Sequence, residues 1–190
     1  MRGYFGVGVE GISKSMNAGT IFRTAHAFGA SFVFTVGAVY DQAKGRLADT
    51  SNATTQVPFY AFPDRDSLLL PEKCRLVGVE LTDDAIELPS FRHPLNAAYI
   101  LGPERGSLSA ELTERCEFVV KIPMKFCVNV GIAAAIVMYD RVNSIGGFAP
   151  RGVHAGGPVE APKEHVHGAP AFRTLAGKYL TTPPEPHKTK

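Results

Sequence analysis

The chain has 190 residues, a hydrophobic content of 45% and a formal net charge of +2, which suits about one compact domain. The longest apolar run, at residues 128–138, is too short and too rich in alanine and glycine to cross a bilayer, and the first residues resemble a strand rather than a charged leader. Cys74, Cys116 and Cys127 form no CxxC pair and suit free thiols in a reducing compartment, so we expect a soluble, cytoplasmic protein.

The charge is unevenly distributed along the chain. Residues 148–190 hold six Lys/Arg and three Asp/Glu, a net charge of +3, which leaves −1 for residues 1–147. Affinity for phosphate needs clustered positive charge rather than a favourable average. A nucleic acid would therefore have to bind a local basic patch, a partner subunit or the tail.

Strand-like runs alternate with helix-period segments along the first three quarters of the chain. We expect strands at residues 4–12, 31–37, 58–62, 75–81, 97–102 and 118–123, and helices at 17–28, 64–70, 109–115 and 129–145. Alternation of this kind, with nearly continuous apolar strands, is typical of a parallel sheet. The predicted class is α/β, with helices on both faces of a mostly parallel sheet.

The composition changes after residue 147. Residues 148–190 contain seven of the fourteen prolines and four of the six histidines, and only 169–180 has the pattern of a short helix. This composition favours an extended or disordered tail. The alternative, a segment that becomes ordered on a partner subunit or on substrate, remains open.

Two patterns resemble functional motifs without their structural context. GVGVEG at residues 6–11 satisfies GxGxxG, which would indicate a nicotinamide-dependent oxidoreductase, but only five residues precede it and its glycines alternate with valines as in a strand. HVH at residues 165–167, with His154, lacks further ligands at tetrahedral spacing, so we expect no metal site.

Three other segments contain the candidate site residues. In NAGTIFRTAHAFG, residues 17–29, Asn17 suits a helix cap and Gly29 a helix end. Arg23 lies among apolar neighbours, where it is either a surface arginine or a functional cation. YILGPERGSLS, residues 99–109, is a strand that runs into a Gly-Pro turn, the kind of place where open α/β sheets bind ligands.

The third segment, residues 120–141, is a strand, a proline-containing turn and a helix with closely spaced small residues. Small residues permit close approach of backbone or another subunit, although a tightly packed core helix has the same composition. In this order the three segments resemble the signature motifs of the SpoU (TrmH-like) branch of the SPOUT superfamily, the RNA ribose 2′-O-methyltransferases. The resemblance covers residues 4 to about 145.

The resemblance implies a fold, a cofactor and an oligomeric state. A domain at residues 1–147 would contain a C-terminal trefoil knot, in about 75–145, that binds S-adenosyl-L-methionine, and it would act as a homodimer with its site near the subunit interface. RNA would be bound by this domain, by its dimer mate and by the tail. The resemblance implies tRNA as the first choice of substrate and rRNA as the second.

The resemblance also implies site residues. The catalytic positions would be Arg23, Asn17, Glu104 and Asn129, and the cofactor pocket would include Leu81, Gly102, Gly106, Ile122, Met124, Cys127 and Val130. A guanidinium stays protonated in proteins, so we expect Arg23 to hold a phosphate or stabilise the developing alkoxide rather than to act as a base. Asn17 and Asn129 would orient these groups, and Glu104 would fix its loop or pair with Arg23.

One departure from the family pattern favours an alternative function. Where the third motif commonly reads Ser-Leu-Asn, this chain has Cys127, Val128 and Asn129, and a thiol is a poor hydrogen-bond donor. This change and the −1 charge of residues 1–147 leave open a catalytically silent RNA-binding module with the same fold.

Overall fold

The structure is a computed structural model that describes residues 3–39, 56–148, 151–152 and 155–157. Contacts divide the chain into two units, residues 1–148 and 149–190. The helices and strands named here all belong to the first unit. The pattern at 169–180 and the histidines at 154, 165 and 167 lie outside the described residues.

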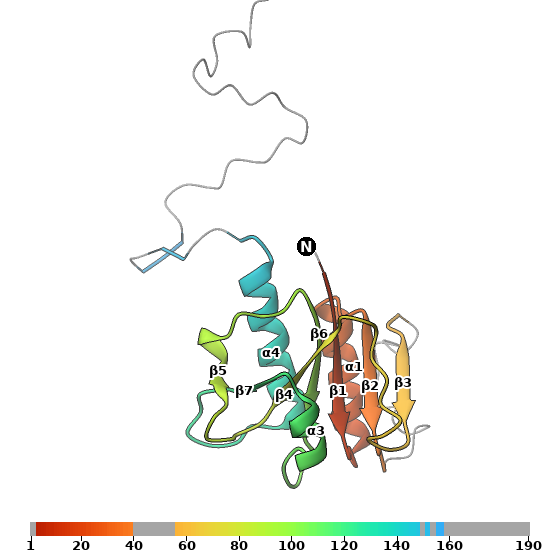
Figure 1. The fold of residues 1–190 in the computed structure, drawn as a ribbon. Coiled ribbons are helices and arrows are strands. Elements are labelled where there is room, and N and C mark those ends of the chain that lie inside the picture. The colour runs from red at the N-terminus through yellow and green to blue at the C-terminus, as the bar shows by residue number, and fades with distance from the viewer. Residues whose placement is uncertain (1–2, 40–55, 149–150, 153–154, 158–190) are drawn as a thin grey trace, which may run out of the picture. The chain divides into compact units, whose positions relative to one another are not determined.

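The described part of the chain forms one sheet of seven strands, in the order β3-β2-β1-β6-β4-β7-β5, and each neighbouring pair is parallel (Figure 1). The strands are β1 (Tyr4–Glu10), β2 (Phe32–Val36), β3 (Phe59–Phe62), β4 (Arg75–Val79), β5 (Ile86–Glu87), β6 (Asn96–Leu101) and β7 (Phe118–Lys121). The helices are α1 (Ser15–Ala27), α3 (Ala110–Arg115) and α4 (Val130–Ile145), with a 3-10 turn η2 (Leu88–Ser90). The predicted α/β class and parallel sheet are confirmed.

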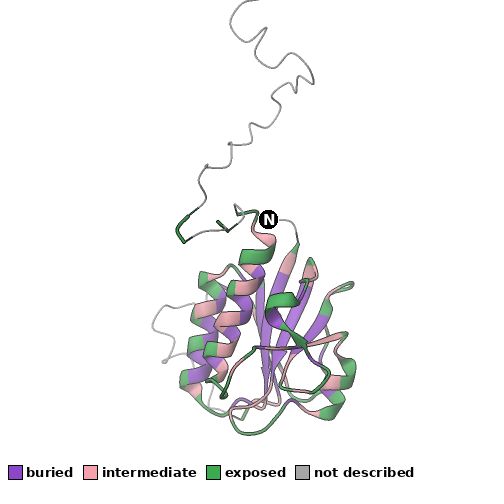
Figure 2. Cartoon of the chain, turned by 90° about the vertical axis from the view of Figure 1, so that its left-hand side faces the viewer, coloured by how far each residue is buried: buried purple, intermediate pink, exposed green. Residues whose placement is uncertain are grey.

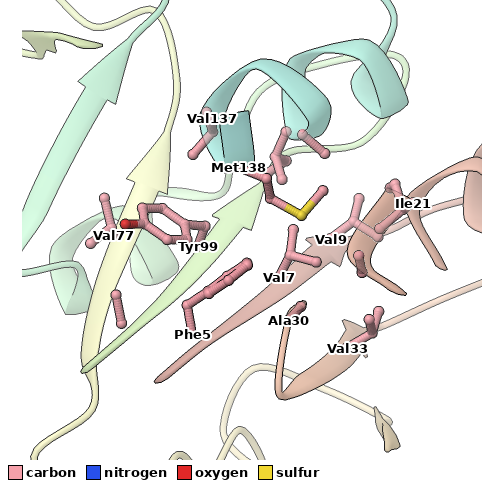
Figure 3. Close-up of a cluster of buried hydrophobic side chains, with 14 of the residues drawn as sticks. Phe5, Val7, Val9, Ile21, Ala30, Val33, Val77, Tyr99, Val137 and Met138 are labelled. Carbon is pink, nitrogen blue, oxygen red and sulfur yellow. The ribbon is translucent and has the colours of Figure 1, made fainter. Parts of the chain in front are cut away.

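Helices α1 and α4 lie together on one face of the sheet, and the strands between the layers are buried (Figure 2). In each helix the buried residues recur at i, i+3, i+4 and i+7, the spacing of a single apolar stripe. These stripes pack on Phe5, Val7 and Val9 of β1, with Met138 of α4 and Ile21 of α1 above them (Figure 3). This core is the larger of the two.

The second core, on the opposite face, explains the glycines of β1. Gly6 and Gly8 lie within β1, and a Cβ at either position would fall 2.2–2.3 Å from the ring of Phe32 or Phe34 of β2. The two rings therefore fill the space that side chains on β1 would occupy. GVGVEG is thus a strand with room for aromatic neighbours, not the turn of a dinucleotide-binding loop.

The prediction of a helix at residues 64–70 is wrong. Residues 63–67 form bends and a turn, in which Asp64 Oδ1 accepts the Ser67 N–H at 2.8 Å. An aspartate side chain that bonds to backbone further along competes with helix formation and stabilises a turn. The short elements β5 and η2 were not predicted, because two or three residues are too few to show periodicity.

Arg141 of α4 is fully buried and ties the helix to the amino ends of two strands. Its guanidinium donates to the carbonyl oxygens of Pro94 at 2.6 Å, Leu95 at 2.6 Å and Tyr4 at 3.3 Å, and to the Tyr99 hydroxyl at 3.0 Å. Burial raises the pKa of Tyr99 to about 12, against the opposing effect of the guanidinium. The role of this arginine is therefore structural.

The trefoil knot requires that one part of the chain passes through a loop formed by another part. The order of strands in the sheet does not show whether the chain does so, and the knot therefore stays a prediction. Among the described residues, no helix is both long enough and apolar enough to cross a bilayer.

Candidate functional site

The candidate site lies at the carboxyl edge of the sheet. Because all the strands are parallel, the loops that follow β1, β4, β6 and β7 meet at this edge (Figure 1). They comprise residues 11–14, 80–85, 102–109 and 122–129. The three segments singled out in the sequence each contribute to this set of loops or to the helix beside them.

Glu104, in the loop after β6, is the centre of a hydrogen-bond network. Its carboxylate accepts the backbone N–H groups of Ser13 at 3.0 Å and Lys14 at 2.9 Å, the Ser13 hydroxyl at 3.0 Å and Asn17 Nδ2 at 3.0 Å. Burial raises the pKa of Glu104, but these hydrogen bonds outweigh it and hold the pKa below the ordinary 4.5. The anionic carboxylate therefore fixes the loop after β1 and the start of α1.

Asn17 connects this carboxylate to the third motif. While its Nδ2 donates to Glu104, its Oδ1 accepts Asn129 Nδ2 at 3.0 Å, and Asn129 Oδ1 in turn accepts the Gly131 N–H at 2.8 Å. Asn129 thus caps α4. The predicted capping role of Asn17 is wrong: Lys14 occupies the cap position, and Asn17 is a buried residue inside the first turn of α1.

Arg23 lies outside this network. It follows Asn17 by six residues, which places it about 240° further around α1, and its side chain is exposed. Among the described residues it makes no hydrogen bond or ion pair, so the alternative in which Glu104 pairs with Arg23 is not observed. The structure therefore brings together Asn17, Glu104 and Asn129, and leaves Arg23 facing solvent.

A cavity of about 100 Å³ lies between the ends of β4 and β7. Four of the seven predicted cofactor residues line it, namely Leu81, Ile122, Met124 and Cys127. Its remaining lining residues are Val79, Glu80, Lys121, Val128 and Ala133. The walls are thus mostly apolar, with one acidic and one basic side chain.

The other three predicted residues do not line this cavity. Gly102 has a steric reason to be glycine, because a Cβ would lie 2.6 Å from the Leu108 backbone nitrogen. Gly106 has φ +118°, a conformation that side chains disfavour. Val130 packs against the larger core. Gly102 and Gly106 therefore shape the loop, and any contact with a ligand would come from its backbone.

Glu80 is a residue that the sequence analysis missed. Its Oε1 accepts the Leu81 N–H at 2.8 Å and its Oε2 accepts the Leu108 N–H at 2.6 Å, so it joins the end of β4 to the loop after β6. An acidic residue directly after an apolar run, at the carboxyl end of a parallel strand, was the available signal.

A larger cavity, of about 580 Å³, lies over the ends of β1, β2 and β3 and contains none of the predicted site residues. Glu10 lines it, accepting Arg65 Nε at 2.6 Å and the Ser109 N–H at 2.8 Å. Burial raises the pKa of Glu10, but these contacts outweigh it and lower the pKa overall. We place the candidate site at the smaller cavity, because four predicted cofactor residues line it and its lining residue Val128 directly precedes Asn129, which the hydrogen-bond network joins to the other two motifs.

Comparisons with known proteins identify the family of this chain. A profile of the SpoU rRNA Methylase family matches residues 5–139. The 23S rRNA (guanosine-2′-O-)-methyltransferase RlmB of Nitrosomonas europaea is 28% identical over 171 residues, 83% of this chain and 62% of that protein. The tRNA (guanosine(18)-2′-O)-methyltransferase TARBP1 of Mus musculus is 27% identical over 140 residues, 68% of this chain and 9% of that protein.

A crystal structure of an AdoMet-bound rRNA methyltransferase from Sinorhizobium meliloti has the same fold, with a TM-score of 0.68 at 19% identity over 76% of this chain and 58% of that one. The chain spans less than two thirds of the length of each of these relatives. The profile match covers well over half of the chain, all of the first two motifs and residues 120–139 of the third. The chain therefore belongs to the SpoU rRNA Methylase family.

Proposed function

We propose that this chain transfers the methyl group of S-adenosyl-L-methionine to a ribose 2′-hydroxyl of RNA. The observation that carries the proposal is the network of Glu104, Asn17 and Asn129, which joins three family motifs beside a cavity lined by four predicted cofactor residues. The names of the relatives support the reaction, because two are 2′-O-methyltransferases and one was crystallised with AdoMet.

The cavity suits part of this cofactor. Apolar walls at Leu81, Ile122 and Met124 match an adenosyl group, and Glu80 and Lys121 match its charged substituents. About 100 Å³ is less than a whole nucleoside-sized ligand needs, so the exposed loops 80–85 and 122–129 would complete the site. When bound, the cofactor supplies a methyl group activated by a sulfonium, and the protein's residues have to position the hydroxyl.

In our proposal Arg23 meets the RNA. Its guanidinium is exposed and stays protonated, so it holds a substrate phosphate or stabilises the negative charge that develops on the attacking oxygen. Asn17 and Asn129 orient the reacting groups, and Glu104 holds the loop after β1 and the start of α1 in place. The exposed Cys127 thiol lines the cavity and contributes little hydrogen bonding.

We further propose that the chain works as a homodimer in the cytoplasm. Large apolar side chains are exposed around the starts of α1 and α4, among them Met16 at 73%, Phe126 at 86% and Ile132 at 51%. Exposed apolar side chains gathered beside a site are typical of an interaction surface. Three free cysteines suit a reducing compartment.

tRNA is the proposed substrate, with rRNA second. Each RNA class has a relative in support, the mouse tRNA enzyme and the Nitrosomonas rRNA enzyme. The alternative is a catalytically silent RNA-binding module, which Cys127 in place of the usual serine favours. RNA specificity of this kind depends on how single-stranded loops are presented to the site.

The first experiment measures transfer of radiolabelled methyl from S-adenosylmethionine into unmodified tRNA and rRNA pools, with identification of the labelled nucleotide. We expect label in a 2′-O-methylnucleoside, and a loss of about 100-fold or more in rate for Arg23→Ala. Arg92→Ala, which removes an exposed arginine from the loop before β6, serves as the matched control and is expected to keep its rate. No transfer into either pool, with no cofactor binding, would instead support the silent module.

A further inference from the structure

Glu80 places a carboxylate at the wall of the candidate cofactor cavity. The residue directly follows β4, is half-buried, and lines the cavity between the ends of β4 and β7. The N–H groups of Leu81 and Leu108 hold its two oxygens, at 2.8 and 2.6 Å. Each oxygen accepts one of these bonds and retains a second lone pair, so the carboxylate keeps acceptor capacity.

No described cation neutralises this carboxylate. The ion pairs of the described residues involve Glu10, Glu111, Glu117 and Asp140, and none involves Glu80. Lys121 is the other charged residue of the cavity lining, but its Nζ donates to the carbonyl oxygens of Thr82 and Asp83, both at 3.4 Å. Lys121 keeps its own charge in the same lining, but a half-buried carboxylate that has no ion-pair partner among the described residues favours the cationic part of a ligand.

The proposed reaction changes the charge of the group bound beside this anion. The carbon–sulfur bond breaks and its electron pair stays on sulfur, the methyl carbon bonds to the ribose oxygen, and the hydroxyl proton passes to solvent. The cofactor therefore enters with a positive sulfonium and leaves as a neutral thioether. An anion at the cavity wall interacts favourably with the first and has no such interaction with the second.

We propose that Glu80 is a specificity-determining residue that makes the pocket select the cationic sulfonium cofactor over its neutral thioether product. The inference rests on the proposed function and assigns the selection to one side chain. As a consequence, the thioether product dissociates and S-adenosylmethionine takes its place, because the attraction to Glu80 is lost when the methyl group leaves the sulfur.

The test is calorimetric titration of the full chain with three ligands. They are S-adenosylmethionine, S-adenosylhomocysteine, and the analogue that carries an amine in place of the methylated sulfur and is therefore also cationic. We expect the wild type to bind both cationic ligands about tenfold more tightly than the thioether. Glu80→Gln should lose this preference by weakening only the cationic ligands, and Glu80→Asp, which keeps the charge, should retain it.

Glu72→Gln is the matched control, because it removes an exposed carboxylate from the turn before β4, outside the cavity and the loops beside it. It should leave the selectivity unchanged. An equal loss of affinity for all three ligands in Glu80→Gln would mean that the residue only braces the loop, and would overturn the inference. If Glu80→Gln does not fold, the wild-type selectivity is measured from low to high salt, and a ratio that does not fall with salt overturns it as well.

The two proposals fail differently in this experiment. If the wild type binds none of the three ligands, the proposed function fails. If the wild type binds them and Glu80→Gln keeps the wild-type preference for the cationic ligands, only the role of Glu80 fails.

Discussion

Glu104 is placed where a negative charge stabilises the start of a helix and the loop before it. Its carboxylate accepts four hydrogen bonds, from Ser13, Lys14 and Asn17, in a segment about ninety residues earlier in the chain. Bonds to a charged acceptor are stronger than those to a neutral one. The side chain thus acts as a fixed anchor for the first motif, and its ionisation is coupled to folding.

Glu104→Gln is expected to reduce the free energy of unfolding by about 2 kcal/mol at pH 7. The amide NH₂ group of glutamine cannot accept hydrogen bonds, so some of the donors of Ser13, Lys14 and Asn17 would lose their acceptor. The folded-state pKa of Glu104 lies below the ordinary 4.5, so this stabilisation is present above about pH 4.5 and is lost as the pH falls through the folded pKa. Urea unfolding at pH 7, 5 and 3.5 should show the difference from wild type shrinking at the lowest pH.

Glu114→Gln, at an exposed carboxylate of α3, is the control and should leave the stability unchanged at all three pH values. A difference for Glu104→Gln that stays constant down to pH 3.5 would contradict a charged anchor.

At the scale of elements, the loop between β6 and α3 is held from both sides. Glu10 of β1 accepts the Ser109 N–H at 2.8 Å, and Glu80 after β4 accepts the Leu108 N–H at 2.6 Å. Glu104, within the loop, binds the segment after β1. Three carboxylates from neighbouring strands and loops therefore fix the second motif, whose residues Pro103, Ser107 and Ser109 line the larger cavity.

The pairing of β1 with β2 depends on glycines that leave space for aromatic rings. We expect Gly8→Ala to destabilise the protein by about 1–3 kcal/mol, because the new Cβ would lie 2.3 Å from the fully buried Phe34 ring. Chemical denaturation measures the loss. Adding Phe34→Leu to Gly8→Ala should cost less than the sum of the two single changes. Additive costs would show that the ring is not the obstacle.

At the scale of the whole molecule, the exposed apolar surface and the candidate site adjoin. Ile132, in the first turn of α4, is 51% exposed and lies three residues from Asn129. If two copies pair through this surface, each site lies next to the partner subunit. Catalysis and association are then coupled, because the same helices position the network and form the interface.

Ile132→Glu should convert the proposed dimer into a monomer, since it places a charge in an apolar contact. Light scattering should give twice the 20.4 kDa of one chain for the wild type, and one chain for the variant. Methyl transfer should fall with dimer content. Leu69→Glu, at a 79% exposed position beside a different cavity, is the control and should stay dimeric. A wild type that is monomeric at all concentrations would refute the dimer.

The amino-acid sequence by itself determined the α/β class, the parallel sheet, the helix end at Gly29 and the positions of the three motifs. These features are encoded in the periodicity of single elements, in a glycine at positive φ and in short motifs whose order along the chain is read directly from the sequence. The family profile confirms the resemblance that the motifs carried.

Only the tertiary structure decided what the site residues touch. It shows that Asn17 is not a helix cap but hydrogen-bonds to both Glu104 and Asn129. These partners are 87 and 112 residues away from Asn17 along the chain. It added Glu80, and it left Arg23 outside the network. Partners so far apart in sequence are brought together by sheet order, and no local pattern encodes which loops meet at one edge of a sheet.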